Sequence, residues 1–289
     1  MVGAFGKMKI LVTGAKGQLG TDVIKELTER GITSVGVDVD DFDITNRRFV
    51  NDANQLNQPD AVIHCAAYTA VDKAESEPEL CRRINEEGTR NIALACKEIG
   101  AKMLYISTDY VFEGIGEHFH KPHDPTNPLS VYGKTKLAGE KSVQEILENF
   151  FIVRISWVFG QNGNNFVKTM LQLGKERNSL NVICDQFGSP TYTEDLAKLL
   201  CDMAVTEKYG VYHATNEGIC SWADFAQEIF RLANIDAKIN RIPAAEYPTK
   251  AKRPYNSRLD KSCLSEYGFE VMPQWKDALS RFLNQYQNN

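Results

Sequence analysis

A short aliphatic run that leads directly into three spaced glycines constrains the fold of this chain more than any other feature. The run Lys9–Thr13 has the composition of a buried strand, and a helical pattern follows at 19–30. A glycine-rich turn at such a junction lets backbone amides and a helix N-terminus approach a pyrophosphate closely. The spacing alone is equally typical of an ordinary turn, but its flanks favour a dinucleotide site. The residues predicted to form this site are Gly14, Lys16, Gly17, Gln18, Leu19 and Gly20.

The alternation of strand and helix continues through the first two-thirds of the chain. Further strands are predicted at 34–38, 61–65, 103–107 and 151–155, and further helices at 80–99 and 131–147. Helices of this length serve as crossovers between parallel strands. We therefore expect an α/β fold with a doubly wound parallel sheet of the Rossmann type.

The pattern becomes less regular after about residue 157. Helices are predicted at 165–175, at 194–204 and from Ser221, and short strands at 182–184 and 211–213 could rejoin the main sheet. We expect a Rossmann domain at 8–157, rejoined by parts of 180–215, and a smaller substrate-binding lobe within 158–289. Residues 1–7 precede the first strand and are interpreted as an extension or a tag remnant.

Charge and composition argue against several classes of partner. Proteins that bind nucleic acid usually present a clustered basic face, so a net charge of -5 and a pI near 5.7 argue against that partner. No apolar run approaches the ~20 residues that span a bilayer, and the first seven residues are too short for a signal peptide. We therefore expect a cytoplasmic protein with no membrane partner. The seven cysteines have no C-x-x-C spacing, so neither a disulfide framework nor a zinc site is predicted.

Acidic residues after the second predicted strand bear on how a ribose could be held. Asp38 lies where a carboxylate can accept hydrogen bonds from an adenosine ribose, and Asp43 is an equally good candidate. Asp38 favours NAD, whereas Lys16 could pair with the 2′-phosphate of NADP, so the choice between the two stays open. The other predicted cofactor contacts are Ile44, Ala66, Ala67, Tyr68, Tyr132 and Lys136.

A tyrosine and a lysine at the start of the helix predicted at 131–147 form the candidate catalytic pair. Tyr132 and Lys136 lie one turn apart on one face, and a nearby ammonium group favours proton exchange by a phenol. The spacing alone is near chance expectation. Thr108 follows the fourth predicted strand, at the sheet edge where ligands bind, and could contact the same reacting oxygen. Otherwise, a strand-end Ser-Thr-Asp is a routine turn or helix cap.

Several longer blocks carry a family resemblance. They are CAAYTAVDKAESEP (65–78), YISTDYVFEG (105–114), VYGKTKLAGEK (131–141), DQFGSPT (185–191) and RPYNSRL (253–259). Together with the glycine turn, and in this order, they resemble the dTDP-4-dehydrorhamnose reductases, a family of extended short-chain dehydrogenases. The similarity covers essentially everything from Met8 onward.

The resemblance implies a reaction and a role for each candidate residue. It implies reduction of the 4-keto group of a nucleotide-sugar substrate, dTDP-4-dehydro-β-L-rhamnose, with NADPH or NADH as hydride donor and Tyr132 as proton donor. Lys136 would also hold the nicotinamide ribose, and Thr108 would polarise the carbonyl. The alternative role for Trp157 is core packing, and the alternative role for Arg253 and Arg258 is structural ion pairing. The implied substrate contacts are Thr108, Asp109, Trp157, Asn165, Arg253 and Arg258.

The resemblance also bears on metal binding and on rival activities. Some relatives dimerise around Mg²⁺, and Asp22 and Glu194 match two of its ligands, but the tail at 284–289 has no acid for a third. Because some relatives dimerise, a homodimer is possible. Because the third acid is missing, Mg²⁺ is not expected. A nucleotide-sugar dehydratase would have glutamate where Tyr110 stands. A 4-epimerase and a non-catalytic dinucleotide-binding regulatory subunit are the remaining alternatives.

Overall fold

A six-stranded parallel sheet forms the centre of the molecule. The computed structural model describes residues 8–41 and 43–287; the extension predicted at 1–7 lies outside them. The strand order is β10-β5-β4-β3-β1-β2, and every neighbouring pair is parallel. The predicted doubly wound α/β fold is thus confirmed. The strands are β1 (Lys9–Thr13), β2 (Thr33–Val37), β3 (Ala61–His64), β4 (Lys102–Thr108), β5 (Phe150–Ile155) and β10 (Gly210–His213).

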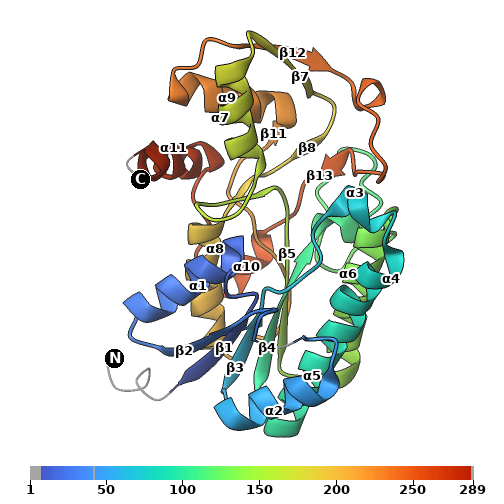
Figure 1. Ribbon diagram of the computed structural model, residues 1–289, viewed down its shortest axis with the longest axis vertical. Helices are drawn as coiled ribbons and strands as arrows, with labels where there is room; N and C mark the ends of the chain where they lie inside the picture. The colour runs from blue at the N-terminus through green and yellow to red at the C-terminus, as the bar shows by residue number, and fades with distance from the viewer. Residues whose placement is uncertain (1–7, 42, 288–289) are drawn as a thin grey trace.

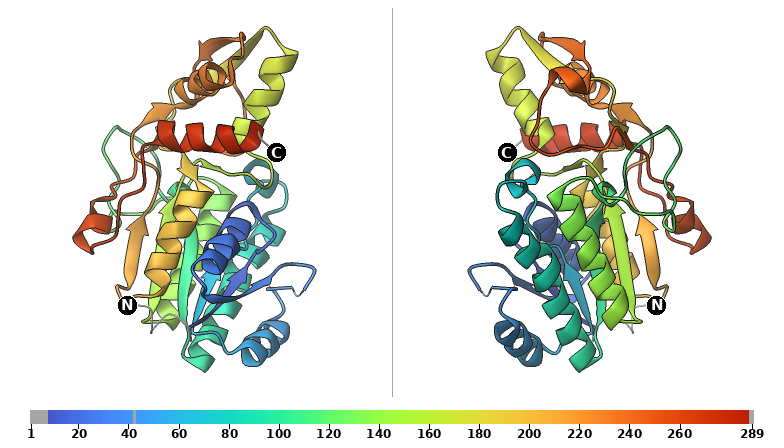
Figure 2. Two further views of the ribbon diagram at one scale, coloured as in Figure 1. Left: turned by 90° about the vertical axis from the view of Figure 1, so that its left-hand side faces the viewer. Right: turned by 90° about the vertical axis from the view of Figure 1, so that its right-hand side faces the viewer.

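Helices cover both faces of this sheet (Figures 1 and 2). Helices α1 (Gln18–Glu29) and α8 (Thr193–Ala204) pack on one face, and α2 (Arg47–Asn57), α5 (Thr89–Ile99) and α6 (Val131–Ile146) cover the other. Successive strand residues supply the two cores, because side chains alternate across a strand. Ile10 and Val12 join one hydrophobic cluster, whereas Leu11 joins the other.

The order of the strands places a crevice at one edge of the sheet. Strand β2 lies on one side of β1 and β3 lies on the other. The crossover helices after β1 and β3 therefore leave in opposite directions. Such a switch point opens a crevice beyond the carboxyl ends of the strands, where open α/β sheets bind ligands.

A second lobe stands above that edge in Figure 1. Its helices are α7 (Phe166–Glu176), α9 (Trp222–Ala233) and α11 (Trp275–Gln287), around an aromatic core that includes Phe159, Tyr192 and Phe225. Its strands pair in small sheets: β7 (Ser179–Ile183) with β12 (Lys238–Ile242), β6 (Val158–Phe159) with β9 (Thr191–Tyr192), and β8 (Phe187–Gly188) with β11 (Cys220–Ser221) and β13 (Asn256–Ser257). The predicted smaller C-terminal lobe is confirmed in this form.

Two elements differ from their predictions. The strand predicted at 211–213 joins the main sheet as β10, but the one at 182–184 belongs to β7 and pairs with β12. The helix predicted at 80–99 is divided into α4 (Pro78–Arg82), a π-helical turn over Arg83–Gly88, and α5. The short remaining elements are α3 (Val71–Ala74), α10 (Ser262–Glu266) and 3₁₀ turns at Asp109–Val111 and Ala244–Glu246.

Within 8–41 and 43–287, none of the helices combines the length and the apolar character needed to cross a membrane. All seven cysteines are free thiols.

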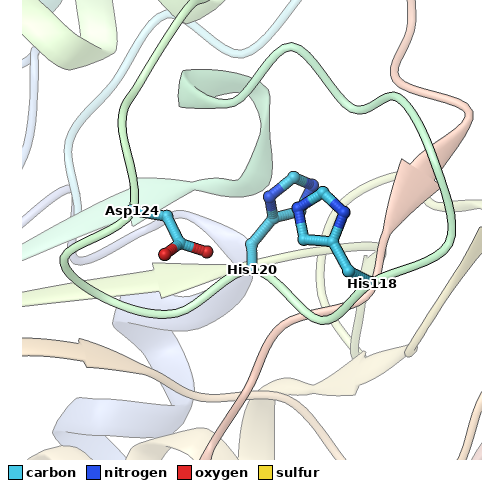
Figure 3. A group of neighbouring side chains, drawn as sticks. All are labelled: His118, His120 and Asp124. Carbon is cyan, nitrogen blue, oxygen red and sulfur yellow. The ribbon is translucent and has the colours of Figure 1, made fainter.

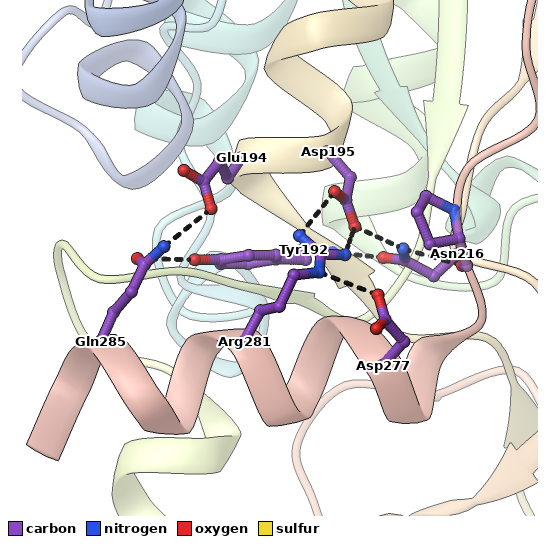
Figure 4. Close-up of polar contacts among 8 residues, drawn as sticks. Tyr192, Glu194, Asp195, Asn216, Asp277, Arg281 and Gln285 are labelled. Atoms are coloured by element: carbon purple, nitrogen blue, oxygen red, sulfur yellow. Dashed lines mark hydrogen bonds and ion pairs between the residues drawn. The ribbon is translucent and has the colours of Figure 1, made fainter.

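A polar network fastens the last helix to the first turn of α8 (Figure 4). Arg281 of α11 donates two hydrogen bonds to Asp195, at 2.9 and 2.7 Å. Asn216 donates a third to the same carboxylate at 2.8 Å, and its own carbonyl oxygen accepts from the backbone of Tyr192 at 2.7 Å. The carboxylate of Asp195 is only 4% exposed, so these hydrogen bonds replace contacts with water that it loses on folding.

Removal of the arginine from this network should therefore destabilise the protein. We expect Arg281→Ala to lower the free energy of unfolding by ~1–3 kcal/mol, below the usual cost of breaking a fully buried pair because Arg281 is 32% exposed. Urea denaturation measures this change. The matched control is Arg231→Ala, which removes an exposed pair with Glu228 in the same lobe and should cost less than about 1 kcal/mol. Equal losses in the two variants would contradict the assignment.

Candidate active site

One cavity of about 960 Å³ occupies the crevice at the carboxyl ends of β1, β3, β4 and β5. It brings together most of the residues that the sequence analysis singled out, although they come from positions more than 140 residues apart. The predicted residues that line it are Gly14, Lys16, Gly17, Gln18, Leu19, Asp38, Asp43, Ile44, Ala66, Ala67, Tyr68, Thr108, Asp109, Tyr132, Lys136 and Trp157.

Two glycines give the turn after β1 its shape. Gly14 has a φ of +67°, a left-handed conformation that glycine adopts without strain. A Cβ atom there would lie 2.7 Å from the backbone nitrogen of Ala66. Gly20 does not line the cavity, but a Cβ on it would lie 2.1 Å from the carbonyl oxygen of Gly14. The glycines thus let α1, the turn and the end of β3 approach closely.

A methyl group at position 20 should therefore disrupt the turn. We expect Gly20→Ala to weaken NADPH binding at least about tenfold, because the added Cβ must displace the Gly14 carbonyl and the amides beside it. Titration of NADPH fluorescence measures the affinity, and a thermal melt measures folding. Unchanged affinity in a folded variant would show that this turn does not hold the cofactor.

Charged groups surround the end of the cavity that lies beside β2 and the glycine turn. The Asp38 carboxylate accepts a hydrogen bond from the backbone amide of Lys16 at 2.8 Å, which holds the end of β2 against the glycine turn. The Lys16 ammonium forms an exposed ion pair with Asp40 at 2.9 Å. Asp43 accepts hydrogen bonds from the backbone and hydroxyl of Thr45, both at 2.8 Å. Both signs of charge are therefore present at this end of the cavity.

The phenol of Tyr132 sits in the first turn of α6. Ser130 caps this helix by accepting a hydrogen bond from Gly133 at 3.1 Å, which places Tyr132 beside the end of β4. The ring of Tyr110 meets it edge-on, with 5.4 Å between ring centroids. Burial raises the pKa of Tyr132, while the Thr108 hydroxyl lowers it. The phenol therefore stays protonated at neutral pH, as a proton donor must be.

The ammonium group of Lys136 lies against β4. Its Nζ donates a hydrogen bond to the carbonyl oxygen of Ile106 at 2.6 Å and lies 4.1 Å from the ring centroid of Tyr105. Burial lowers the pKa of Lys136 to about 7, and the charge of Glu140, one turn later on α6, opposes that shift. The contacts with Ile106 and Tyr105 hold the ammonium in place without help from a ligand.

Asp109, directly after β4, connects the main sheet to the second lobe. Its carboxylate accepts hydrogen bonds from Thr108 at 3.0 Å and from Ser257 of β13 at 2.5 Å. Burial raises its pKa to about 6. The Thr108 hydroxyl therefore donates to Asp109 when that carboxylate is charged, and its oxygen accepts from the backbone amide of Tyr110 at 3.2 Å.

Trp157 lies where β5 passes into the second lobe. Its φ of +51° is unusual for a residue with a side chain, and such conformations are held only where the surroundings enforce them. The indole stacks on that of Trp222, with 3.7 Å between centroids and 14° between planes. This stack orients the indole at the wall of the cavity.

Three predicted substrate contacts lie outside the residues that line the cavity. Asn165 caps α7 by accepting from Lys168, and its amide donates to Gln18 at 2.8 Å. Arg253 pairs with Asp72 at 2.5 Å, and Arg258 lies 4.7 Å from the ring centroid of Phe187.

The carboxylates matched to a metal site have other partners. Asp22 accepts a hydrogen bond from the Thr193 hydroxyl at 2.5 Å. Glu194 accepts from the Gln285 amide at 3.1 Å (Figure 4). It also pairs with the Lys25 ammonium at 3.4 Å. A hard cation needs several free oxygen ligands, and an ammonium here competes with it. This donor set does not fit Mg²⁺.

The sequence analysis missed residues that support the site from behind. Asn85 exchanges hydrogen bonds with the backbone of Tyr68, at 2.8 and 3.1 Å, and so shapes the loop after β3. Glu140 is buried with Arg154, at 2.7 Å, and accepts from Ser107 at 2.5 Å. The position of Glu140 four residues after Lys136 was the one available signal. Nothing local in the sequence marks Asn85.

The doubly wound sheet and the glycine turn, beside a cavity lined by Thr108, Tyr132 and Lys136, are features of the extended short-chain dehydrogenases. The chain belongs to the family described as RmlD substrate binding domain, whose model matches residues 8–288.

Similar proteins cover nearly the whole chain. The dTDP-4-dehydrorhamnose reductase of Escherichia coli K12 is 41% identical over 292 residues, which cover 96% of this chain and 98% of that protein. The crystal structure of a dTDP-4-dehydrorhamnose reductase from Clostridium acetobutylicum is 44% identical and superposes with a TM-score of 0.95, covering 97% of this chain and 100% of the other. The reductase of Bacillus anthracis, solved in complex with NADP, is 43% identical with a TM-score of 0.94, covering 96% and 99%. The predicted family is confirmed.

Proposed function

We propose that this chain reduces dTDP-4-dehydro-β-L-rhamnose to dTDP-L-rhamnose with NADPH or NADH. The observation that carries the proposal is the single cavity in which the glycine turn, Thr108, Tyr132 and Lys136 meet. Three similar proteins that bear the name dTDP-4-dehydrorhamnose reductase support it, and one of them was solved with NADP.

The cofactor would lie across the carboxyl ends of β1 and β2. The turn at Gly14 and Gly17 and the N-terminus of α1 offer backbone amides to the pyrophosphate. Asp38 or Asp43 would accept hydrogen bonds from the adenosine ribose. The Lys16 ammonium could leave its ion pair with Asp40 and bind a 2′-phosphate instead. The proposed contacts around the rest of the dinucleotide are Gln18, Leu19, Ile44, Ala66, Ala67 and Tyr68.

The chemistry divides between the cofactor and the chain. The bound dinucleotide supplies a hydride to C4 of the sugar. Tyr132 gives its phenolic proton to the oxygen on C4 as the carbonyl π bond breaks, and solvent returns a proton to the tyrosinate. Lys136, held by Ile106 and Tyr105, binds the nicotinamide ribose and stabilises negative charge on the phenol. The Thr108 hydroxyl would turn from Asp109 to donate to the same oxygen, in a site where preformed dipoles favour the transition state.

The substrate would lie between the sheet edge and the second lobe. Trp157, oriented by Trp222, offers an indole face to the sugar, and Asp109 links substrate binding to the lobe through Ser257. Arg253 would leave Asp72, and Arg258 would leave the Phe187 ring, to bind the diphosphate of the substrate. Asn165 would act indirectly, by holding the Gln18 side chain. We assign residues 8–157, with β10, to the cofactor domain and most of 158–289 to the substrate lobe.

Activity of the purified full chain tests the proposal directly. We expect loss of reduced cofactor absorbance, in step with chromatographic formation of dTDP-rhamnose, when dTDP-4-dehydrorhamnose is supplied with NADPH or NADH. Cofactor binding without any turnover would identify a regulatory subunit instead. Tyr110 stands where a dehydratase would place its glutamate, so we expect no dehydratase activity. The free thiols are in keeping with action in the cytoplasm, and gel filtration would show whether a homodimer forms.

A further inference from the structure

A histidine-rich loop before the catalytic helix gathers three metal-binding side chains outside the active-site cavity. His118, His120 and Asp124 each present one ligand atom, and the three atoms lie within 4.8 Å of one another. Figure 3 shows the two imidazole rings packed together and the Asp124 carboxylate turned toward them. The described residues contain this one cluster of at least three such ligands.

Local backbone structure explains why these residues meet. His118 and His120 are two positions apart in the loop, and their rings meet edge-on with 4.6 Å between centroids. His120 is pinned on both sides, because its N–H donates to Arg258 at 2.9 Å and its carbonyl accepts from Asp260 at 2.8 Å. A turn then brings Asp124 back: one carboxylate oxygen accepts from the backbone of Lys121 at 2.7 Å. The second oxygen is not used in that turn.

His120 is the anchor of the cluster and has an unsatisfied nitrogen. Its side chain stacks on Phe112, with 4.4 Å between centroids, and the residue is only 6% exposed. Its Nε2 is buried without a hydrogen-bond partner, which is costly for a polar atom.

We propose that His118, His120 and Asp124 bind one divalent transition-metal ion of the Zn²⁺ type, with water completing the coordination. Two imidazoles and a carboxylate suit such ions rather than Mg²⁺ or Ca²⁺, which prefer oxygen ligands. Ligand atoms around a tetrahedral Zn²⁺ lie about 3.3 Å apart, given bonds of ~2.0–2.2 Å. The exposed His118 and the half-buried Asp124 therefore close in by up to about 1.5 Å on the fixed His120.

The bound ion would fasten the loop that leads to Ser130 and α6. None of the three ligands lines the cavity, so the site is independent of the proposed reductase activity. Metal binding should stabilise the folded state and raise Tm.

Calorimetric titration of the full chain with ZnCl₂ tests the site. We expect one equivalent to bind, and His118→Ala and Asp124→Asn each to weaken binding at least about tenfold. Neither change should unfold the protein, since His118 is exposed and Asn can still accept from Lys121. The matched control is His123→Ala, an exposed histidine of the same loop outside the cluster, which should bind like the unchanged chain.

Cobalt offers a second readout. Co²⁺ in a four-coordinate site should give visible d–d absorption that His118→Ala abolishes and excess Zn²⁺ displaces. Unchanged zinc affinity in both ligand variants, or an equal loss in His123→Ala, would overturn the proposal.

Discussion

Tyr132→Phe is expected to lower kcat by about 10²–10⁴-fold while leaving the affinity for NADPH within about twofold. The change deletes one hydroxyl and little volume, and the phenol next to Thr108 is the proposed proton donor. Burial already raises the pKa of Tyr132, so the hydroxyl enters the reaction protonated. Steady-state turnover and a fluorescence titration with NADPH measure the two quantities separately.

A buried tyrosine outside the cavity provides the control. Tyr212 on β10 is 1% exposed and donates its hydroxyl to the Lys208 carbonyl at 2.6 Å, away from the cavity. We expect Tyr212→Phe to cost some stability and to leave kcat within about threefold. If Tyr132→Phe turned over as fast as Tyr212→Phe, the proton would have to come from another group.

Lys136→Met is expected to lower turnover to about a thousandth of the original rate or less. It should also weaken cofactor binding. The ammonium is the positive charge held beneath the site by Ile106 and Tyr105, and methionine nearly matches its volume. The variant should nonetheless fold well, because burial of an ammonium group opposes folding. Lys134→Met, on the exposed side of the same helix, is the matched control and should keep its activity.

The same lysine predicts a pH dependence of stability. Its pKa is about 7 in the folded protein and 10.5 in its ordinary state, so the unfolded chain binds more protons between these values. The contribution of Lys136 to the free energy of unfolding should therefore rise as pH increases from about 7 to about 10.5. Urea denaturation across this range should show a smaller rise for Lys136→Met than for Lys134→Met. Parallel curves for the two variants would exclude a depressed pKa at Lys136.

Local patterns in the sequence were sufficient for the central architecture. Runs such as Lys9–Thr13 are buried on both faces, which gives parallel strands a continuous apolar composition. Glycines follow that strand where a helix must begin at once, and Ser130 precedes α6 as a helix cap. These signals depend on neighbours in sequence, so they can be recognised without a tertiary structure.

Other features depend on distant partners. The helix predicted at 80–99 contains a π turn because Asn85 bonds to the Tyr68 backbone and Gly88 packs against Ile44, where a Cβ would lie 2.7 Å away. The strand at 182–184 looked able to join the main sheet, but β12, whose residues lie 59 positions later in the chain, pairs with it. Neither partner is visible in a local pattern.

The sequence by itself indicated the glycine turn, the Tyr132 and Lys136 pair and the family, because motifs in a fixed order along the chain carry all three. Only the tertiary structure decided what surrounds them. It placed Lys136 on Ile106 and Tyr105, tied Asp109 to Ser257, stacked Trp157 on Trp222, and gathered His118, His120 and Asp124. Burial and hydrogen-bond partners set a pKa or a side-chain orientation, and both come from segments that meet only when the chain folds.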